Sequence, residues 1–301
     1  MACLRASKDI IDSSIYSAGL ADNHLKTPKK YQPHPYLMEN LEESIRLELK
    51  TDPVVVRKQA MWCGLKPGLR VLDAGCGPGK ATSILHEMIR PGGSILGIDY
   101  SEERIRYAKR HYGQKPGIDF QAYDFSKPLN GLGHFDLIWV RFVLEYYLQG
   151  STTIVENLTT CLKPGGYLCL LDLDHNCLNH YGLPVRMERM LSNIMATLEE
   201  KHNFDPYAGR KLYSYLYDLG YEDIQVDFVA DSVIYGKAKD TDAFNWIKKA
   251  EVTTKKVWEV CECYPGGHNA LFADLIRFIN DPRRFIYTPL ILCKGMKPIS
   301  S

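Results

Sequence analysis

The sequence has no long apolar run and almost no net charge. A membrane-spanning helix needs roughly 20 consecutive apolar residues, and no window of this chain approaches that length. The formal net charge is +1, so no overall field would draw the chain to nucleic acid or to an acidic membrane. Two local basic clusters, around residues 26–30 and 248–256, are interpreted as solvated faces. These absences disfavour membrane-spanning and nucleic-acid-binding proteins.

The cysteines also lack the paired spacing of a zinc site. There are nine of them, and the closest two, Cys261 and Cys263, have no matching second pair. An odd number of scattered thiols is typical of a reduced intracellular protein. The first thirty residues contain no apolar core of the kind that a signal peptide has. We therefore expect a cytoplasmic protein without a bound metal.

The length and composition indicate one large domain with additions. At 301 residues, of which 45% are hydrophobic, the chain can bury a sizeable core. We expect an N-terminal arm and helical cap (1–62), followed by a core domain (63–235) with a helical insertion at about 180–220. A helical lid insertion and the last strand complete the chain (236–301).

Strands and helices alternate along the core domain. The alternation predicts an α/β fold, in which a doubly wound, mostly parallel sheet carries helices on both faces. Ligands of such sheets bind at the carboxyl ends of the strands. Pro289 lies inside the last predicted strand, so we expect that strand to be irregular or at an edge. The seven predicted strands are 69–73, 94–98, 118–123, 135–140, 167–171, 224–229 and 285–293.

Apolar spacing and capping signals predict the helices. Thr153 and Glu156 match a capping box, which would open a helix that ends at Leu162. Pro265-Gly266-Gly267 would divide residues 241–280 into two helices. The other predicted helices are 37–49, 53–63, 80–90, 101–112, 183–201 (with a methionine-rich stripe typical of a core) and 208–219.

The most informative segment is VLDAGCGPGK, residues 71–80. An apolar strand ends there in Asp73, and glycines follow at every second position. Glycine can adopt a positive φ and lets a ligand approach the backbone, while the free N–H groups of the next helix can face a carboxylate. The dinucleotide fingerprint needs a third glycine where this chain has Lys80 or Thr82, depending on the starting glycine. The spacing therefore disfavours NAD.

The pattern acid-x-Gly-x-Gly-x-Gly resembles motif I of the class I S-adenosylmethionine (SAM) dependent methyltransferases. The strand end at Asp99, the strand beginning FDLI at Phe135 and the segment LKPGG (162–166) are similar to that family as well. The resemblance is strong over about residues 63–175, and looser features near both 205–221 and 295–298 resemble its small-molecule branch, which includes ubiquinone and menaquinone enzymes. It implies a Rossmann-like fold, SAM as the cofactor and methyl transfer to a small or medium-sized organic acceptor.

The same resemblance assigns residues to the methionine half of SAM. Gly75, Gly77 and Gly79 would form the turn under it, and Asp73 would hold its ammonium group. Arg141, just after the fourth strand, lies where this family lines the sulfonium pocket.

Four further residues would hold the nucleoside half. Asp99 would accept hydrogen bonds from both ribose hydroxyls, since its two oxygens suit a vicinal diol. Tyr100 would pack beside the adenine, Asp124 would accept from its amino group, and the Phe125 N–H would reach a ring nitrogen.

The acceptor side is less defined. In-line displacement places the acceptor opposite the sulfur, and an O or N acceptor must lose a proton, so a base can assist. The candidates near the expected site are Asp172, His175 and Glu145. The acids in the segment DLDHN (172–176) could imitate a metal site, but strand-end acids beside a substrate are the commoner explanation, so no metal is expected.

Two other functions stay open at this point. The chain could be a SAM-binding regulatory or partner subunit without turnover, or a methyltransferase that acts on protein or RNA.

Segments 37–63 and 241–280 are expected to close over the pocket, because additions at these places lie near the carboxyl edge of this fold. The oligomeric state and the acceptor itself cannot be predicted from the sequence.

Overall fold

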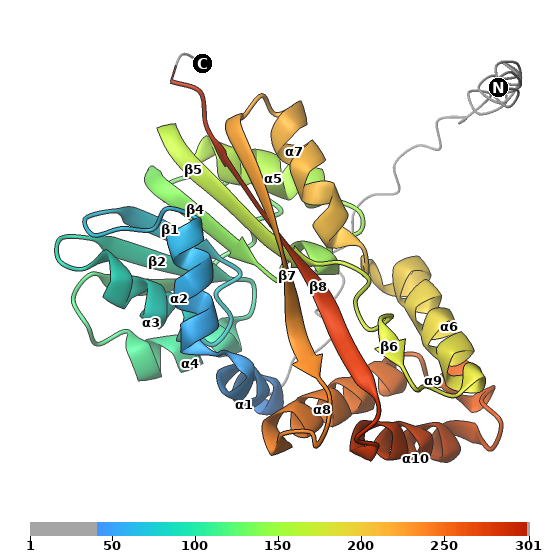
Figure 1. The fold of residues 1–301 in the computed structure, drawn as a ribbon. Coiled ribbons are helices and arrows are strands. Elements are labelled where there is room, and N and C mark those ends of the chain that lie inside the picture. Colours follow the sequence, from blue (N-terminus) through green and yellow to red (C-terminus); the bar gives the residue numbers. More distant parts are fainter. Residues whose placement is uncertain (1–40, 300–301) are drawn as a thin grey trace, which may run out of the picture. The chain divides into compact units, whose positions relative to one another are not determined.

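The computed structural model describes residues 41–299, which form a mixed sheet with helices on both faces (Figure 1). The sheet has eight strands in the described residues, in the order β3-β2-β1-β4-β5-β8-β6, and β7 pairs with β8. The strands are β1 (Arg70–Ala74), β2 (Ser94–Asp99), β3 (Ile118–Ala122), β4 (Phe135–Arg141), β5 (Leu162–Leu173), β6 (His180–Tyr181), β7 (Glu222–Ile234) and β8 (Phe285–Met296).

The doubly wound α/β prediction is confirmed, with one added strand. The two-residue strand β6 was not predicted, and residues 1–40 of the predicted N-terminal arm and cap (1–62) lie outside the described residues. The helices are α1 (Leu41–Lys50), α2 (Pro53–Trp62), α3 (Lys80–Ile89), α4 (Glu102–Tyr112), α5 (Ser151–Thr160), α6 (Val185–His202), α7 (Leu212–Asp218), α8 (Asp240–Lys256), α9 (Trp258–Glu262) and α10 (Gly267–Asn280), with 3-10 turns η1 (Leu144–Tyr146) and η2 (Ala208–Lys211).

Two local predictions about helices are wrong. Helix α5 begins at Ser151, after Gly150 in a left-handed conformation (φ 102°), so Thr153 and Glu156 lie inside the helix and form no capping box. The segment after residue 239 contains three helices instead of two. The predicted break at Pro265-Gly266 separates α9 from α10, and a second break at Val257 separates α8 from α9.

The last strand is irregular, as one alternative of the prediction had it, because its pairing with β7 shifts register between Asp231 and Ile234, next to Pro289; it does not lie at an edge. Strands β1 to β5 are parallel, and β8 runs antiparallel between β5 and β7. Pro289 is tolerated there because β5 ends opposite Leu290, at Leu173. The Pro289 carbonyl still accepts a hydrogen bond from the Asp174 N–H at 2.9 Å. In an antiparallel strand the N–H and C=O of one residue point toward the same neighbouring strand. An N–H at position 289 would therefore point past the last residue of β5, so the strand pairing loses no hydrogen bond there.

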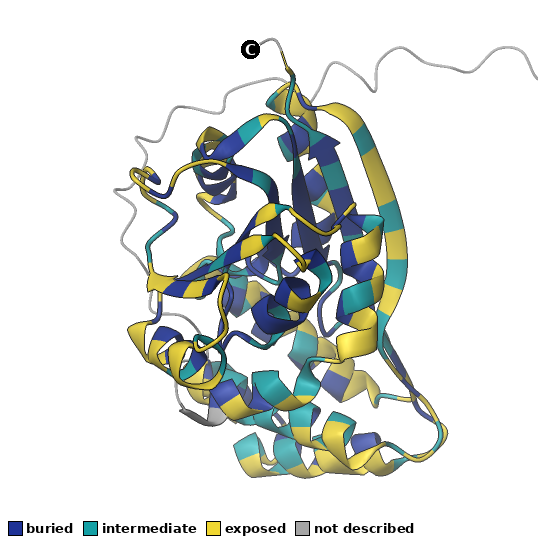
Figure 2. Cartoon of the chain, turned by 90° about the vertical axis from the view of Figure 1, so that its left-hand side faces the viewer, coloured by how far each residue is buried: buried dark blue, intermediate teal, exposed yellow. Residues whose placement is uncertain are grey.

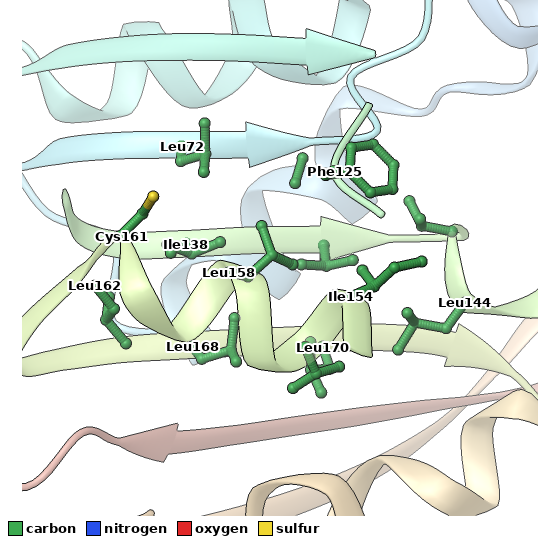
Figure 3. Close-up of a cluster of buried hydrophobic side chains, with 14 of the residues drawn as sticks. Leu72, Phe125, Ile138, Leu144, Ile154, Leu158, Cys161, Leu162, Leu168 and Leu170 are labelled. Carbon is green, nitrogen blue, oxygen red and sulfur yellow. The ribbon is translucent and has the colours of Figure 1, made fainter. Parts of the chain in front are cut away.

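The apolar strands separate two cores. Along β1, Leu72 faces a cluster that includes α5 and α7, while Val71 faces a cluster that includes α2, α3 and α4. The same alternation holds for Ile138 and Trp139 in β4. A strand that is covered on both faces requires a nearly continuous apolar run, and this explains why these segments were recognisable as buried strands. Figure 2 shows the buried central strands, and Figure 3 shows the cluster around Leu72.

A third core lies under the helical additions. The methionine-rich stripe of α6 packs with side chains of α8, α9 and α10, including Trp246 and Leu271. Met187 is fully buried in this cluster, so the stripe has the packing role that its pattern is typical of. In Figure 1 these four helices gather together beside the N-terminal half of β8.

The two-sided core predicts a large cost for truncating Leu72. Leu72→Ala should lower the free energy of unfolding by about 2–5 kcal/mol, because the lost contacts leave a cavity that the strand cannot close. Leu49→Ala, which removes the same atoms from a side chain that is 57% exposed, should change it by less than about 0.5 kcal/mol. Urea denaturation of both variants would measure this, and equal effects would contradict the assignment of the core.

Candidate functional site

The site residues predicted from the sequence gather where the parallel strands end. In the register of the sheet, Ala74 at the end of β1 lies opposite Ile98 of β2 and Val140 of β4. Arg141 at the end of β4 lies opposite Leu171 of β5. The sheet therefore brings Asp73, Asp99, Arg141 and Asp172 to one edge, which we call the carboxyl edge.

The glycine turn between β1 and α3 is held by backbone hydrogen bonds and close packing. Gly75 (φ 84°) donates its N–H to the Ile98 carbonyl at 2.8 Å. Gly79 (φ 92°) precedes α3, and a Cβ there would lie 2.8 Å from the Cβ of Ala108 and 2.9 Å from the ring of Phe120. Helix α3 has no side-chain cap at this end, so its first N–H groups point out of the helix without such a partner.

Asp99 fixes the turn from the neighbouring strand. Its Oδ2 accepts the N–H of Gly77 at 2.9 Å, and its Oδ1 accepts the N–H of Ser101 at 3.0 Å. Arg104 adds a cationic group 3.9 Å from Oδ1. A carboxylate has about four lone-pair sites, so the buried Asp99 keeps acceptor capacity beyond these contacts. Tyr100, the next residue, is 49% exposed.

Asp73 lies at the end of β1 and is almost completely buried. Its Oδ2 accepts a hydrogen bond from the Thr82 hydroxyl at 2.6 Å. Burial is the largest influence on this carboxyl and raises its pKa to about 7, with a further rise from the Asp99 charge, while the Thr82 hydrogen bond and Arg141 oppose the rise. Asp73 therefore changes charge near neutral pH.

The Asp124-Phe125 pair follows β3. Asp124 Oδ1 accepts hydrogen bonds from the N–H and the hydroxyl of Ser126, and Oδ2 lies 3.1 Å from the Lys127 ammonium. Burial alone would raise the pKa of Asp124, but the contacts with Ser126 and Lys127 outweigh it and leave the pKa below its usual value. Phe125 is buried in the core around α5, so only its backbone could meet a ligand.

Arg141 lies between an amide and an aromatic ring. Its Nε donates to Gln59 Oε1 of α2 at 2.9 Å, and its guanidinium lies 4.0 Å from the centre of the Phe142 ring. Burial lowers the pKa of Arg141, and the charges of Asp231, Asp73 and Asp172 oppose this. Sequence reasoning missed Gln59 and Phe142. Phe142 could not have been found from a pattern, because its unusual φ of 59° is visible only in the structure.

Asp172 is engaged by backbone groups on both oxygens. Oδ2 accepts the N–H groups of Val143, Leu144 and Glu145 at 3.1, 2.7 and 3.3 Å, and Oδ1 accepts the N–H of Leu173 at 2.8 Å. Burial and the charge of Glu145 raise the pKa of Asp172 well above its usual range, although the N–H donors oppose the rise. These contacts make Asp172 the support of η1, and they leave its oxygens poorly placed to take a proton from an acceptor.

Glu145 and His175 lie in different surroundings. Glu145 is buried, and its Oε2 accepts a hydrogen bond from the Asn176 amide at 2.5 Å. Asn176 in turn accepts from the Lys249 ammonium at 2.9 Å. The sequence predicted that Lys249 lies on a solvated face. This prediction is wrong, because Lys249 is half-buried and donates to Asn176. The His175 ring instead packs edge-on against Tyr207, with 5.1 Å between ring centres.

Comparison with known protein families identifies the family to which this chain belongs. A family model described as "Methyltransferase domain" matches residues 65–231, which is more than half of the chain. The chain belongs to this methyltransferase-domain family. The match covers the sheet from β1 into β7, including the glycine turn and Asp99.

Curated relatives of this methyltransferase-domain protein share only part of their length with it. Demethylmenaquinone methyltransferase of Lactococcus lactis is 32% identical over 117 residues, which are 38% of this chain and 46% of the relative. Phosphoethanolamine N-methyltransferase 3 of Arabidopsis thaliana is 26% identical over 180 residues, or 60% of this chain and 34% of the relative. The chain thus spans less than half the length of these relatives.

Solved structures agree on the fold. A phosphoethanolamine N-methyltransferase of Haemonchus contortus, crystallised with phosphomonomethylethanolamine and S-adenosylhomocysteine, aligns with a TM-score of 0.52 and 15% identity over 85% of this chain and 57% of its own. A cyclase aligns with a TM-score of 0.51 and 20% identity over 82% of each chain. Because both activities occur on one architecture, the fold by itself does not determine the reaction.

The described part of the methyltransferase-domain protein was compared with the requirements of a metal site and of a membrane-spanning helix. Within residues 41–299, no three His, Cys, Asp or Glu side chains are grouped so that they could hold a metal ion. Over the same range, none of the helices has the length and apolar character needed to cross a membrane.

The contacts of Asp172 predict that its removal affects stability. Asp172→Asn replaces an acceptor oxygen with an NH2 group that faces N–H donors, so it should lower the free energy of unfolding by roughly 2–4 kcal/mol. Asp174→Asn is the matched control. Asp174 pairs with Arg210, whose side chain is 50% exposed, and such pairs contribute less than about 1 kcal/mol.

Chemical denaturation of both variants measures this difference. A stable Asp172→Asn protein that has lost only its activity would instead support Asp172 as a base.

Proposed function

We propose that this protein transfers a methyl group from SAM to a small or medium-sized organic acceptor by in-line displacement. The observation that carries the proposal is the glycine turn of β1, which Asp99 holds from β2 through the N–H of Gly77 at 2.9 Å. This turn lies in the segment that matches the methyltransferase-domain family. The alternative of a SAM-binding subunit without turnover has no observation in its favour.

The residues of the turn fit the methionine half of SAM. In this proposal Gly75, Gly77 and Gly79 lie under it, and the uncapped start of α3 faces its carboxylate. Asp73 would hold the ammonium group. Arg141, beside Asp73, would line the cavity that holds the sulfonium.

The neighbouring strand ends fit the nucleoside half. Asp99 keeps acceptor capacity for the two ribose hydroxyls, and the exposed ring of Tyr100 is available beside it. Asp124 and the N–H of Phe125 would receive the adenine. Asp124 Oδ2 has the Lys127 ammonium at 3.1 Å as its partner, and a carboxylate oxygen has a second lone pair that could accept from an amino group.

SAM supplies an activated methyl group, and the protein's task is to position the acceptor and to exclude water. Asp172 contributes by holding η1 through the N–H groups of Leu144 and Glu145. Glu145, which belongs to η1, accepts a hydrogen bond from Asn176. Because backbone N–H groups occupy Asp172, we propose Glu145 or His175 as the group that takes a proton from an O or N acceptor. Asp172 is then a positioning residue.

Helical additions would cover the acceptor. Helix α1 packs on α8, where Arg46 donates a hydrogen bond to Asn245 across 199 residues of sequence. A cover that excludes water suits a partly apolar acceptor. The division of the chain at residues 62 and 235 and the cytoplasmic location remain predictions.

Incubation of the purified protein with methyl-labelled SAM and pools of small metabolites tests the proposed function. Label in a small organic product is expected. Label in protein or RNA would move the acceptor to another class, and tight SAM binding without transfer to any pool would favour the regulatory alternative.

Asp99→Ala should weaken SAM binding by about 1–3 kcal/mol, since it deletes hydrogen bonds to a charged acceptor. Asp119→Ala is the matched control, because Asp119 is an exposed aspartate on β3 opposite Leu96, away from the end of β2. Calorimetric titration with SAM gives both affinities. Wild-type affinity in Asp99→Ala would contradict the ribose assignment.

SAM affinity should also depend on the charge of Asp73. Its folded pKa is raised from 3.8 to about 7, so the proton that it retains stabilises the fold at low pH, and this contribution is lost as the pH rises through about 7. An ammonium group requires the ionised form. Affinity for SAM should therefore fall by up to about tenfold for each pH unit below 7.

Asp73→Asn should remove most of this pH dependence, whereas Asp119→Asn should keep it. Calorimetry at a series of pH values below neutrality measures both slopes. An identical slope in wild type and Asp73→Asn would show that another group titrates.

A further inference from the structure

Three half-buried cations from distant parts of the sequence lie near the carboxyl edge: Lys50 and Arg141 contact one aromatic ring, and the charge of Lys249 acts on Lys50. Lys50 ends α1, Arg141 ends β4, and Lys249 lies in α8. The Lys50 ammonium lies 4.7 Å from the centre of the Phe142 ring, and the Arg141 guanidinium lies 4.0 Å from the same centre. Lys249 donates to Asn176, which also donates to Glu145, a candidate base.

No carboxylate of the described residues lies within 4 Å of any of the three cations. Their hydrogen-bond partners are neutral amides: Gln59 for Arg141 and Asn176 for Lys249. This is unusual, because removing a cation from water is costly unless an anion compensates it. Other ion pairs of this protein, such as Arg210 with Asp174 at 2.8 Å, show that its cations do find acids elsewhere.

Acids act on the group only from a distance: Asp231 acts on Lys50 and Arg141, and Asp73 and Asp172 also act on Arg141. Asp231 of β7 is the carboxylate whose charge most affects both Lys50 and Arg141, and its Oδ2 accepts the Ser232 hydroxyl at 2.8 Å. None of these acids forms a direct ion pair with the three cations. Burial lowers the pKa of Lys50 to about 8, Asp231 opposes this, and the charges of Arg46, Lys249 and Arg141 lower the pKa further.

The backbone also indicates a constrained site. Phe142, which carries two of the cations on its ring, has a φ of 59°. A left-handed conformation is costly for a residue with a Cβ and persists where the surroundings enforce it, often at ligand sites. Here the Phe142 N–H bonds to the Leu171 carbonyl at 2.9 Å, so the ring is held at the end of β4.

We propose that Lys50, Arg141 and Lys249 bind an anionic group, a carboxylate or a phosphate, of the methyl acceptor. The proposal rests on the proposed function and names its substrate class. Three cations exceed the single carboxylate of SAM, for which the start of α3 is the proposed partner. Lys249 also donates to Asn176, which donates to Glu145, on the acceptor side of the proposed site.

Inorganic phosphate is the probe, titrated into the full chain with and without saturating S-adenosylhomocysteine. Lys50→Gln and Lys249→Gln should each weaken phosphate binding about tenfold to a hundredfold, as expected for losing one charged hydrogen bond. Lys255→Gln, which removes the same charge from an exposed position of α8, should bind phosphate like the wild type. Lys50→Arg should restore most of the affinity.

Thermal unfolding separates binding from folding. Without phosphate, Lys50→Gln should be at least as stable as the wild type, because it removes a cation that forms no ion pair with an acid of residues 41–299; a structural Lys50 would instead lower the melting temperature. Phosphate should raise the melting temperature of the wild type more than that of Lys50→Gln.

Three results would overturn the proposal: no phosphate binding to the wild type, equal phosphate binding by Lys50→Gln and Lys255→Gln, or loss of SAM binding in Lys50→Gln. The last would assign the cluster to the carboxylate of SAM. Failure of the proposed function has a different signature, since the wild type would then bind no SAM whether or not phosphate binds.

Discussion

The hydrogen bond from the Gly77 N–H to the Asp99 carboxylate joins the first two strands at the point where a ligand would bind. It holds the glycine turn against the end of β2 while Oδ1 of the same carboxylate accepts the Ser101 N–H at the start of α4. Phe120 of β3 packs against the turn, and its ring leaves no room for a Cβ at Gly79. The direction of α3, and with it the direction of its first N–H groups, follows from these contacts.

A second aspartate organises the other side of the carboxyl edge in a different way. Asp99 accepts two backbone N–H groups and keeps capacity for a ligand, whereas Asp172 accepts four and supports the turn of η1. Both acids lie at strand ends and look alike in the sequence. Their burial is similar as well, so the number of N–H groups that converge on each carboxylate determines its role.

Local signals explain what could be predicted from the sequence. The strands were recognisable because burial on both faces demands apolar runs, and the glycine turn because its spacing is a property of ten consecutive residues. Pro289 indicated an irregular strand correctly, but it could not exclude an interior position, because that depends on where β5 ends. The capping box at Thr153 was wrong because the helix begins earlier, after Gly150. Lys50 and Lys249 could not be placed, since their positions depend on how α1 packs against α8.

Calorimetric titration of the wild-type protein with SAM, and separately with NAD, would show whether the glycine turn binds SAM. We expect micromolar binding of SAM and none of NAD, because the turn lacks the third glycine of the dinucleotide fingerprint at Lys80. Absence of SAM binding, or equal binding of both ligands, would rule out this role of the turn and leave only the fold and the family established.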